Sequence, residues 1–146
     1  PNLKMTLLDS LGKRVKFLNE VIGRLGLENV EAIHGRAEDF AKPGLLREQF
    51  DLCVSRAVAN LSTLAEYCLP YVKLDGFFIS YKSEKISEEM QTAQHAIELL
   101  GGSVYGQKEF LLPNSDIYRN LFQIKKVRST PKKYPRKAGL PSKEPL

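Results

Sequence analysis

The chain has 146 residues, enough for a single domain with a sizeable core, and its 42% hydrophobic and 27% charged residues are typical of a globular protein. No apolar run approaches the roughly 20 residues that span a bilayer, and no signal-peptide pattern opens the sequence. The two cysteines, Cys53 and Cys68, lie in apolar contexts and are expected to be free, as in a cytoplasmic protein. The two histidines are far apart, so no metal site is expected. The net charge of +5 favours a polyanionic partner.

The chain is organised around its first strand and first helix. The apolar run over 3–8 is too short for a helix and predicts a buried strand. The leucine, valine and isoleucine positions of 11–25 are spaced 4-3-4-3, which predicts one face of a helix. Ser10 is the expected N-cap of this helix, and Gly26 is the expected left-handed C-cap. An acidic residue, Asp9, therefore stands at the carboxyl end of a strand, immediately before a helix.

Strands and helices are expected to alternate along the rest of the chain. The expected strands cover residues 29–35, 50–58, 77–81, 103–112 and 121–127, and the expected helices cover 60–72 and 84–100, with a turn at 75–76. This alternation predicts an α/β fold with a mostly parallel sheet covered on both faces, and the last two strands predict an antiparallel hairpin. Residues 1–128 are expected to form this domain, and 129–146 a basic, proline-rich tail of extended, irregular structure.

Polar residues follow three of the predicted parallel strands. They are Asp9 and Ser10 after the first strand, Ala37 and Glu38 after the second, and Arg56 after the third. Because ligands of open α/β sheets bind outside the carboxyl ends of the strands, these clusters predict an adenine-nucleoside cofactor site. Asp9 suits the ribose hydroxyls, and Ala37 with Glu38 suits the adenine. The alternative is that Asp9 and Glu38 only favour the starts of the helices that follow them.

The C-terminal tail carries cations without acids over residues 125–143. Lys132, Lys133, Arg136 and Lys137 lie close together around Tyr134, whose ring is expected to stack on an unpaired base. This composition predicts RNA binding. A solvated, solubilising segment is the alternative interpretation of the same charge run.

Five sequence motifs carry a resemblance to a known family. They are LLDSLGKRVKFLNEV, VEAIHGRAED, FDLCVSRAVANL, FFISYK and TPKKYPRKAGLPSKEPL. With these motifs the chain resembles, over essentially its whole length, the bacterial small-subunit ribosomal RNA methyltransferase G family, also called glucose-inhibited division protein B. The resemblance implies a class I, Rossmann-like methyltransferase that uses S-adenosyl-L-methionine to methylate guanine N7 in 16S ribosomal RNA, as a free RNA or in the small ribosomal subunit.

The same resemblance implies roles for individual residues. The cofactor would be bound by Asp9, Ser10, Ala37, Glu38 and Arg56, and the RNA by Lys82, Arg119, Lys132, Lys133, Arg136 and Lys137. Arg56 suits the guanine edge, the cofactor carboxylate or a phosphate; a structural bridge between strand ends is its alternative role. No catalytic residue is expected, because N7 of neutral guanosine carries a lone pair and no proton.

One feature departs from the family's pattern. Class I methyltransferases open with a strand and a glycine-rich G-x-G-x-G turn, and this sequence holds no such motif. We therefore expect a C-terminal portion that lacks the family's N-terminal helices, first strand and glycine-rich turn. That strand would lie between the strands at 3–8 and 50–58, so these two are expected to pair directly or to lie in a rearranged or partner-assisted sheet. We expect negligible methyl transfer by the isolated chain.

Two functions of other classes compete with this interpretation. A non-catalytic RNA-binding α/β domain would use the basic tail without any cofactor. An NAD-type Rossmann oxidoreductase also carries an acid after its second strand, but the missing glycine fingerprint weighs against it. Binding of a cofactor separates the methyltransferase from the RNA-binding domain.

Overall fold

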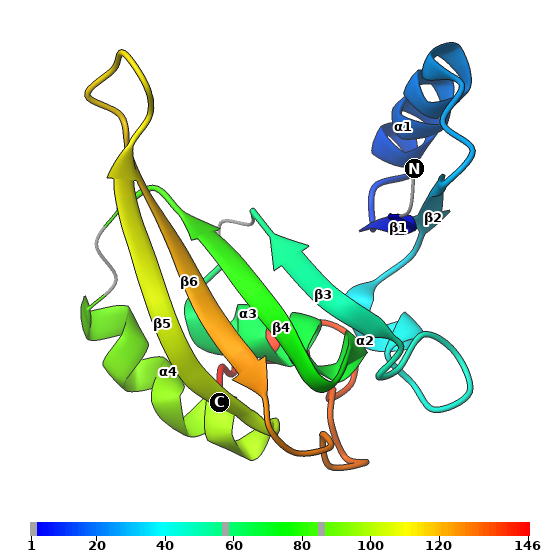
Figure 1. The fold of residues 1–146 in the computed structure, drawn as a ribbon. Helices are drawn as coiled ribbons and strands as arrows, with labels where there is room; N and C mark the ends of the chain where they lie inside the picture. Colours follow the sequence, from blue (N-terminus) through cyan, green and yellow to red (C-terminus); the bar gives the residue numbers. More distant parts are fainter. Residues whose placement is uncertain (1–2, 57–58, 85–86) are drawn as a thin grey trace.

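The strands in the described part of the chain form two separate sheets (Figure 1). The structure, a computed structural model, describes residues 3–56, 59–84 and 87–146. β1 (Met5–Asp9) and β2 (Val30–His34) form a two-stranded parallel sheet. The second sheet has four strands in the order β3-β4-β6-β5. The α/β class and the antiparallel hairpin are confirmed.

The four-stranded sheet mixes parallel and antiparallel pairs. Its strands are β3 (Phe50–Ser55), β4 (Val72–Lys82), β5 (Gly102–Leu111) and β6 (Tyr118–Lys126). β3 runs parallel to β4, and β6 runs antiparallel to both β4 and β5. In the described part of the chain β1 pairs with β2 and not with β3, so the direct pairing that was one expected arrangement is absent there. In the described part of the chain, no strand lies between β1 and β3, and each of these two strands has one unpaired edge.

The first strand and helix form a small unit with β2. Helix α1 (Gly12–Leu25) ends as predicted, with Gly26 in the left-handed conformation at φ 62°. The start differs from the prediction, because Leu11 is the N-cap residue and Ser10 makes no capping bond. Asp9 instead binds the backbone just before the helix, where its Oδ1 accepts a hydrogen bond of 2.8 Å from the Leu11 amide. An aspartate readily bonds the backbone two residues ahead of it, which explains the difference.

The four-stranded sheet is packed against two helices on one face (Figure 1). They are α3 (Leu61–Cys68) and α4 (Ser87–Leu99). Their apolar positions and those of the sheet form the core, which includes Leu61, Leu64, Phe78, Ile97, Phe122 and Ile124, all at most 1% exposed. Each such side chain contributes roughly 1.5–3 kcal/mol by its burial. In the β1-α1-β2 unit, by contrast, Val15 is the one buried hydrophobic residue among those described.

The start of β4 was predicted wrongly. The helix expected over 60–72 ends at Cys68, and a short 3₁₀ turn, η1 (Leu69–Tyr71), leads directly into the strand at Val72. Pro70 lies at the start of this turn, where its missing N–H donor costs nothing but where an α-helix cannot continue. The expected turn at 75–76 is an irregularity inside the strand, with Asp75 at φ 65°.

The C-terminal segment 129–146, here called the strap, crosses the helical side of the molecule (Figure 1). It was expected to be extended and irregular, but it folds back and contains the short helix α5 (Leu140–Lys143). Tyr134 is 6% exposed and belongs to the core. The Arg47 guanidinium donates to the carbonyls of Ala41, Thr130, Pro131 and Tyr134. The strap is therefore part of the packed structure, because its backbone and side chains have partners on the domain.

Candidate functional site

A pocket of about 600 Å³ lies at the carboxyl ends of β3 and β4. Its lining includes three cations, Arg56, Lys82 and Arg119, and two acids, Glu84 and Glu89. The volume lies within the range of roughly 300–1,000 Å³ that is usual for small-molecule sites. The position agrees with the rule that open α/β sheets bind ligands outside the carboxyl ends of their strands.

Lys82 holds the elements around the pocket together. It is the last residue of β4 and only 9% exposed. Its Nζ donates to the carbonyl of Ala59, before α3, at 3.0 Å and to Oε1 of Glu89, on α4, at 2.7 Å. Because a buried ammonium needs such partners, these bonds fix the start of α4 next to the connection between β3 and α3. Lys82 thus holds the end of β4, the start of α4 and the residue before the N-cap of α3 together around the pocket.

The other two cations of the pocket are more open to solvent. Arg56 follows β3 directly and is exposed. Arg119, near the start of β6, is half-buried and its Nη1 donates to the Tyr118 carbonyl at 2.8 Å. Guanidinium groups in this setting can bind a phosphate or carboxylate through paired hydrogen bonds. Arg56, expected to bind the cofactor, thus lines the same pocket as Lys82 and Arg119, which were expected to bind RNA.

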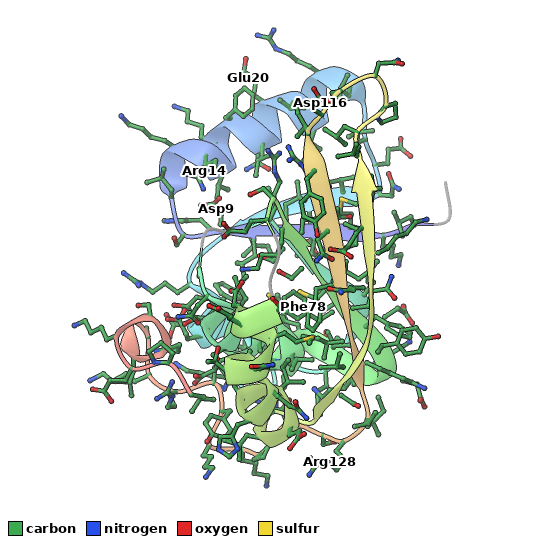
Figure 2. The ribbon with its side chains drawn as sticks, turned by 90° about the vertical axis from the view of Figure 1, so that its left-hand side faces the viewer. Asp9, Arg14, Glu20, Phe78, Asp116 and Arg128 are labelled. Atoms are coloured by element: carbon green, nitrogen blue, oxygen red, sulfur yellow. The ribbon has the colours of Figure 1, made fainter. Side chains whose placement is uncertain are left out.

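A second polar group lies at the carboxyl end of β1 (Figure 2). The Asp9 carboxylate, 19% exposed, forms an ion pair of 2.9 Å with Arg14 and accepts the Leu11 amide hydrogen bond. Burial raises the pKa of Asp9, but the Leu11 amide and the Arg14 guanidinium outweigh this and hold that pKa below its usual value. Ser10 is exposed beside it, and its carbonyl lies 3.2 Å from His34 Nε2.

The second strand brings Ala37 and Glu38 to the same edge as Asp9. The Gly35 amide donates to the Asp9 carbonyl at 3.0 Å, and helix α2 (Ala37–Phe40) begins directly afterwards. Glu38 is 5% exposed, and its Oε1 accepts a hydrogen bond of 2.8 Å from the Gly139 amide of the strap. Asp9 and Ala37 therefore share one sheet edge, while the carboxylate of Glu38 contacts the strap. None of the three lines the Arg56 pocket.

The predicted RNA-binding residues of the strap fall into two groups. Lys132, Lys133 and Lys137 are exposed. Arg136 instead forms a two-pronged ion pair with Glu66, a fully buried acid, at 2.7 Å. The Glu66 carboxylate raises the pKa of Arg136 above its usual value. Tyr134, expected to stack on a base, is buried, so its ring packs inside the protein.

The sequence did not lead us to two acids of these ion pairs, Glu89, which pairs with Lys82, and Glu66, which pairs with Arg136. Glu89 is spaced like any solvated acid in the first turn of a helix. Glu66 lies on α3 between apolar positions, and its partner follows 70 residues later. The signal available for Glu66 was a charged residue on an otherwise apolar helix face. Such a residue predicts a cationic partner, because a buried carboxylate needs one. For Glu89 the sequence held no such signal.

Two further properties concern the described residues only. None of them form a cluster of three or more histidine, cysteine or acidic side chains that could hold a metal ion. Within the same part of the chain, no helix has the length and apolar character needed to cross a membrane.

Solved structures of low sequence identity share the fold. TYW2 of M. jannaschii, solved in complex with AdoMet, superposes with a TM-score of 0.65 at 14% identity over 85% of this chain and 58% of its own. An rRNA methylase from Streptococcus thermophilus superposes with a TM-score of 0.58 at 15% identity over 86% of this chain and 74% of its own. The fold is therefore that of class I methyltransferases.

Sequence relatives are much more similar. Ribosomal RNA small subunit methyltransferase G of Alkaliphilus metalliredigens is 56% identical over all of this chain and 61% of its own length. The protein of the same name from Lachnoclostridium phytofermentans is 55% identical over all of this chain and 60% of its own length. The chain thus spans about 60% of the length of these curated relatives. The family profile described as rRNA small subunit methyltransferase G (GidB) matches residues 1–118, and the chain belongs to this family.

Proposed function

We propose that this chain forms part of an enzyme that uses S-adenosyl-L-methionine to methylate N7 of a guanosine in 16S ribosomal RNA, acting in the cytoplasm on the RNA or the small ribosomal subunit. The observation that carries the proposal is the pocket at the carboxyl ends of β3 and β4, lined by Arg56, Lys82 and Arg119, in a chain of this family. Cations in a pocket of this size suit a nucleotide, because Arg56 and Arg119 can each bind a phosphate.

The residues at the carboxyl end of β1 fit the nucleoside part of the cofactor. Each carboxylate oxygen of Asp9 has a further lone pair beyond its bond to Leu11 or Arg14, which can accept from a ribose hydroxyl. The amides of Ala37 and Glu38, the first two residues of α2, have no partner inside the helix and suit an adenine edge, whereas the next two amides bond the Arg36 carbonyl. Glu38 fits less well, since its carboxylate faces Gly139.

The chemistry asks these residues for positioning rather than for proton transfer. When bound, S-adenosyl-L-methionine supplies an electrophilic sulfonium methyl group. Guanine N7 has a free lone pair, so a general base has no proton to remove. Arg56 and Arg119 would hold phosphate, and Lys82 would keep the pocket walls in place through Ala59 and Glu89. Orienting the two reactants in this way accounts for a large part of a rate enhancement.

A methyl-transfer assay tests the proposal. A protein of the relatives' full length that contains this chain is incubated with tritiated cofactor and small subunits lacking the modification, and the product nucleoside is identified. We expect 7-methylguanosine, and at least tenfold less of it with Arg119→Met, which corresponds to a loss of about 1.4 kcal/mol. Arg128→Met, an exposed arginine outside the pocket, is the control. Labelled RNA with a different modified base, or none, would refute the proposal.

The second candidate is an RNA-binding domain without catalysis, which the exposed Lys132, Lys133 and Lys137 favour. Replacing these three by glutamine leaves the Arg136–Glu66 pair intact. If they bind phosphates, the slope of log affinity against log salt becomes shallower by roughly 0.7–0.9 for each lysine–phosphate ion pair that the substitutions remove. An unchanged slope would show that the strap has only a packing role. Calorimetry with S-adenosyl-L-methionine then separates the candidates, because only the enzyme requires the cofactor.

A further inference from the structure

Binding of an anionic nucleic acid does not explain why the pocket contains two acids. Glu84 and Glu89 line the same pocket as Arg56 and Arg119, and both acids would repel a phosphate. A base, however, offers hydrogen-bond donors that an acid can accept. The pocket therefore has cations suited to phosphate and acceptors suited to a base.

The proposed reaction at N7 determines which edge of guanine remains for recognition. N7 lies on the edge that must face the methyl group, together with the O6 acceptor. The opposite edge of guanine carries two donors, the N1–H and the N2 amino group, so it requires acceptors. A carboxylate offers about four lone-pair sites on two oxygens and can accept both donors side by side.

Glu89 is the better-positioned of the two acids. Its side chain is 24% exposed and sits in the first turn of α4, where Lys82 Nζ donates to its Oε1 at 2.7 Å. This bond uses one lone pair and leaves others on both oxygens. Glu84 is exposed, and in the described part of the chain no ion pair holds it. A carboxylate held in place loses less side-chain entropy on binding than a mobile one.

We propose that Glu89, positioned by Lys82, accepts hydrogen bonds from N1–H and the N2 amino group of guanine and so determines the base specificity of this pocket. The inference rests on the proposed function for the orientation of the base. A purely structural Glu89 would only stabilise the start of α4 and the Lys82 ammonium. Base preference separates the two roles, because a structural acid does not discriminate guanine from adenine.

Binding of mononucleotides to the 146-residue chain tests the proposal. NMR titrations of ¹⁵N-labelled protein with GMP, IMP and AMP compare three ligands that carry the same phosphate. A two-pronged contact to a base discriminates by roughly 5- to 150-fold, so we expect GMP to bind at least about fivefold more tightly than AMP. IMP, which lacks the N2 amino group, should lie between them. The shifted resonances should include Lys82, Glu89 and Arg119.

Substitution of Glu89 sharpens the test. In Glu89→Gln one acceptor oxygen becomes an amide donor, which matches the N1 acceptor and N6 donor of adenine, so the GMP-to-AMP preference should fall to about one or invert. The glutamine keeps an oxygen for Lys82. Glu88→Gln is the matched control, since Glu88 shares the first turn of α4 but does not line the pocket, and its variant should keep the wild-type preference.

Each outcome decides for or against Glu89 as the specificity residue. Equal affinity for GMP and AMP, absence of GMP binding, or an unaltered preference in Glu89→Gln would overturn it. If Glu89→Gln does not fold, as seen in its NMR spectrum, the wild-type series and its mapped shifts decide alone. Methyl transfer is measured separately, with the protein of the relatives' full length. GMP preference without transfer to N7 in that protein leaves this inference standing and refutes the proposed function. Transfer to N7 without GMP preference supports the proposed function and overturns this inference.

Discussion

Single buried charges in this protein are held by partners from distant parts of the chain. The fully buried Glu66 carboxylate accepts hydrogen bonds from the backbone and guanidinium of Arg136, at 2.7 to 3.1 Å. Lys126, also fully buried, donates to the Leu69 and Val72 carbonyls and forms an ion pair of 3.1 Å with Glu48. Such groups make the attachment of the strap sensitive to single substitutions.

Arg136→Met should lower the free energy of unfolding by about 3 kcal/mol. It leaves the Glu66 carboxylate buried without its cation, and breaking a buried pair from one side typically costs about 3–5 kcal/mol. Lys132→Met is the control, because an exposed position changes stability by about 0.5 kcal/mol or less. Urea unfolding curves measure both. Equal midpoints for the two variants would contradict a stabilising role of the Arg136–Glu66 pair.

Tyr71 should make the protein less stable at alkaline pH. Burial raises the pKa of Tyr71 far above its ordinary value of 10.0, and its hydroxyl donates to the Ala37 carbonyl at 2.6 Å. Above pH 10.0 the unfolded chain loses this proton while the folded protein keeps it, so the free energy of unfolding falls as the pH rises.

Tyr71→Phe tests this pH dependence. At neutral pH the variant should be less stable by about 1 kcal/mol, the typical loss for one hydrogen bond. Between neutral pH and about pH 11 its stability should decline less than that of the wild type, because phenylalanine has no proton to lose. Cys68, whose pKa is also raised, is present in both proteins and affects them equally. Parallel declines would argue against Tyr71 as a source of the effect.

At the scale of elements, β4 depends on a glycine at its irregularity. A Cβ at Gly76 would lie 2.6 Å from the Asp51 carbonyl oxygen and 2.8 Å from a methyl carbon of Val72. The backbone of β3 comes this close because the pairing of the two strands shifts register between Phe50 and Leu52. A larger side chain at position 76 would push β3 and β4 apart on the N-terminal side of the pocket.

Gly76→Ala should therefore destabilise the protein by about 1–3 kcal/mol, as for overpacked interior positions. Gly106→Ala is the matched control, because Gly106 also lies in a strand and a Cβ there meets no atom within 4 Å. The control should be neutral or slightly stabilising, since alanine restricts the unfolded chain more than glycine does. Thermal and urea unfolding compare the two variants, and a neutral Gly76→Ala would contradict the close approach.

At the scale of the whole molecule, most of the buried apolar core belongs to the four-stranded sheet and to α3 and α4, the elements drawn together in Figure 1. The buried apolar cluster draws its members from these elements, η1 and the strap. Large apolar side chains remain exposed on the β1-α1-β2 unit, such as Phe17 at 62%, and on the open edge of β3, such as Leu52 at 50% and Val54 at 51%. A region with so little buried apolar surface opens at a lower free energy than the core.

Hydrogen exchange should resolve this difference. We expect the amides of β1 and β2 to exchange faster than those of β4 and β6, whose exchange follows global unfolding. Leu7 and Ile33 report on the first sheet, and Phe78 and Ile124 on the second. Uniform protection across both sheets would show that they unfold as one unit. Our expectation that the isolated chain transfers methyl groups negligibly rests on the missing strand and glycine-rich turn, and the Asp9 edge and the Arg56 pocket also belong to different sheets.

The sequence by itself determined several of the elements and the family. Local periodicity and glycine positions predicted α1 with its Gly26 cap, most of α4 and the β5–β6 hairpin, because these depend on residues within a few positions of one another. The motifs around Asp9, Glu38 and Arg56 led to the family, which the relatives confirm.

Only the tertiary structure decided which side chains meet. Glu38 and Gly139 are 101 positions apart, so no local sequence pattern predicts that the strap binds Glu38, which was expected to bind the cofactor. The pairing of Lys82 with Glu89 likewise depends on how α4 packs beside the end of β4. The separation of the two sheets also follows from packing, since strand edges pair according to which backbones are brought together rather than by their own sequence. The partner of a buried charge or of an open strand edge comes from a distant part of the chain. The residues next to that charge or edge in the sequence therefore do not predict the partner.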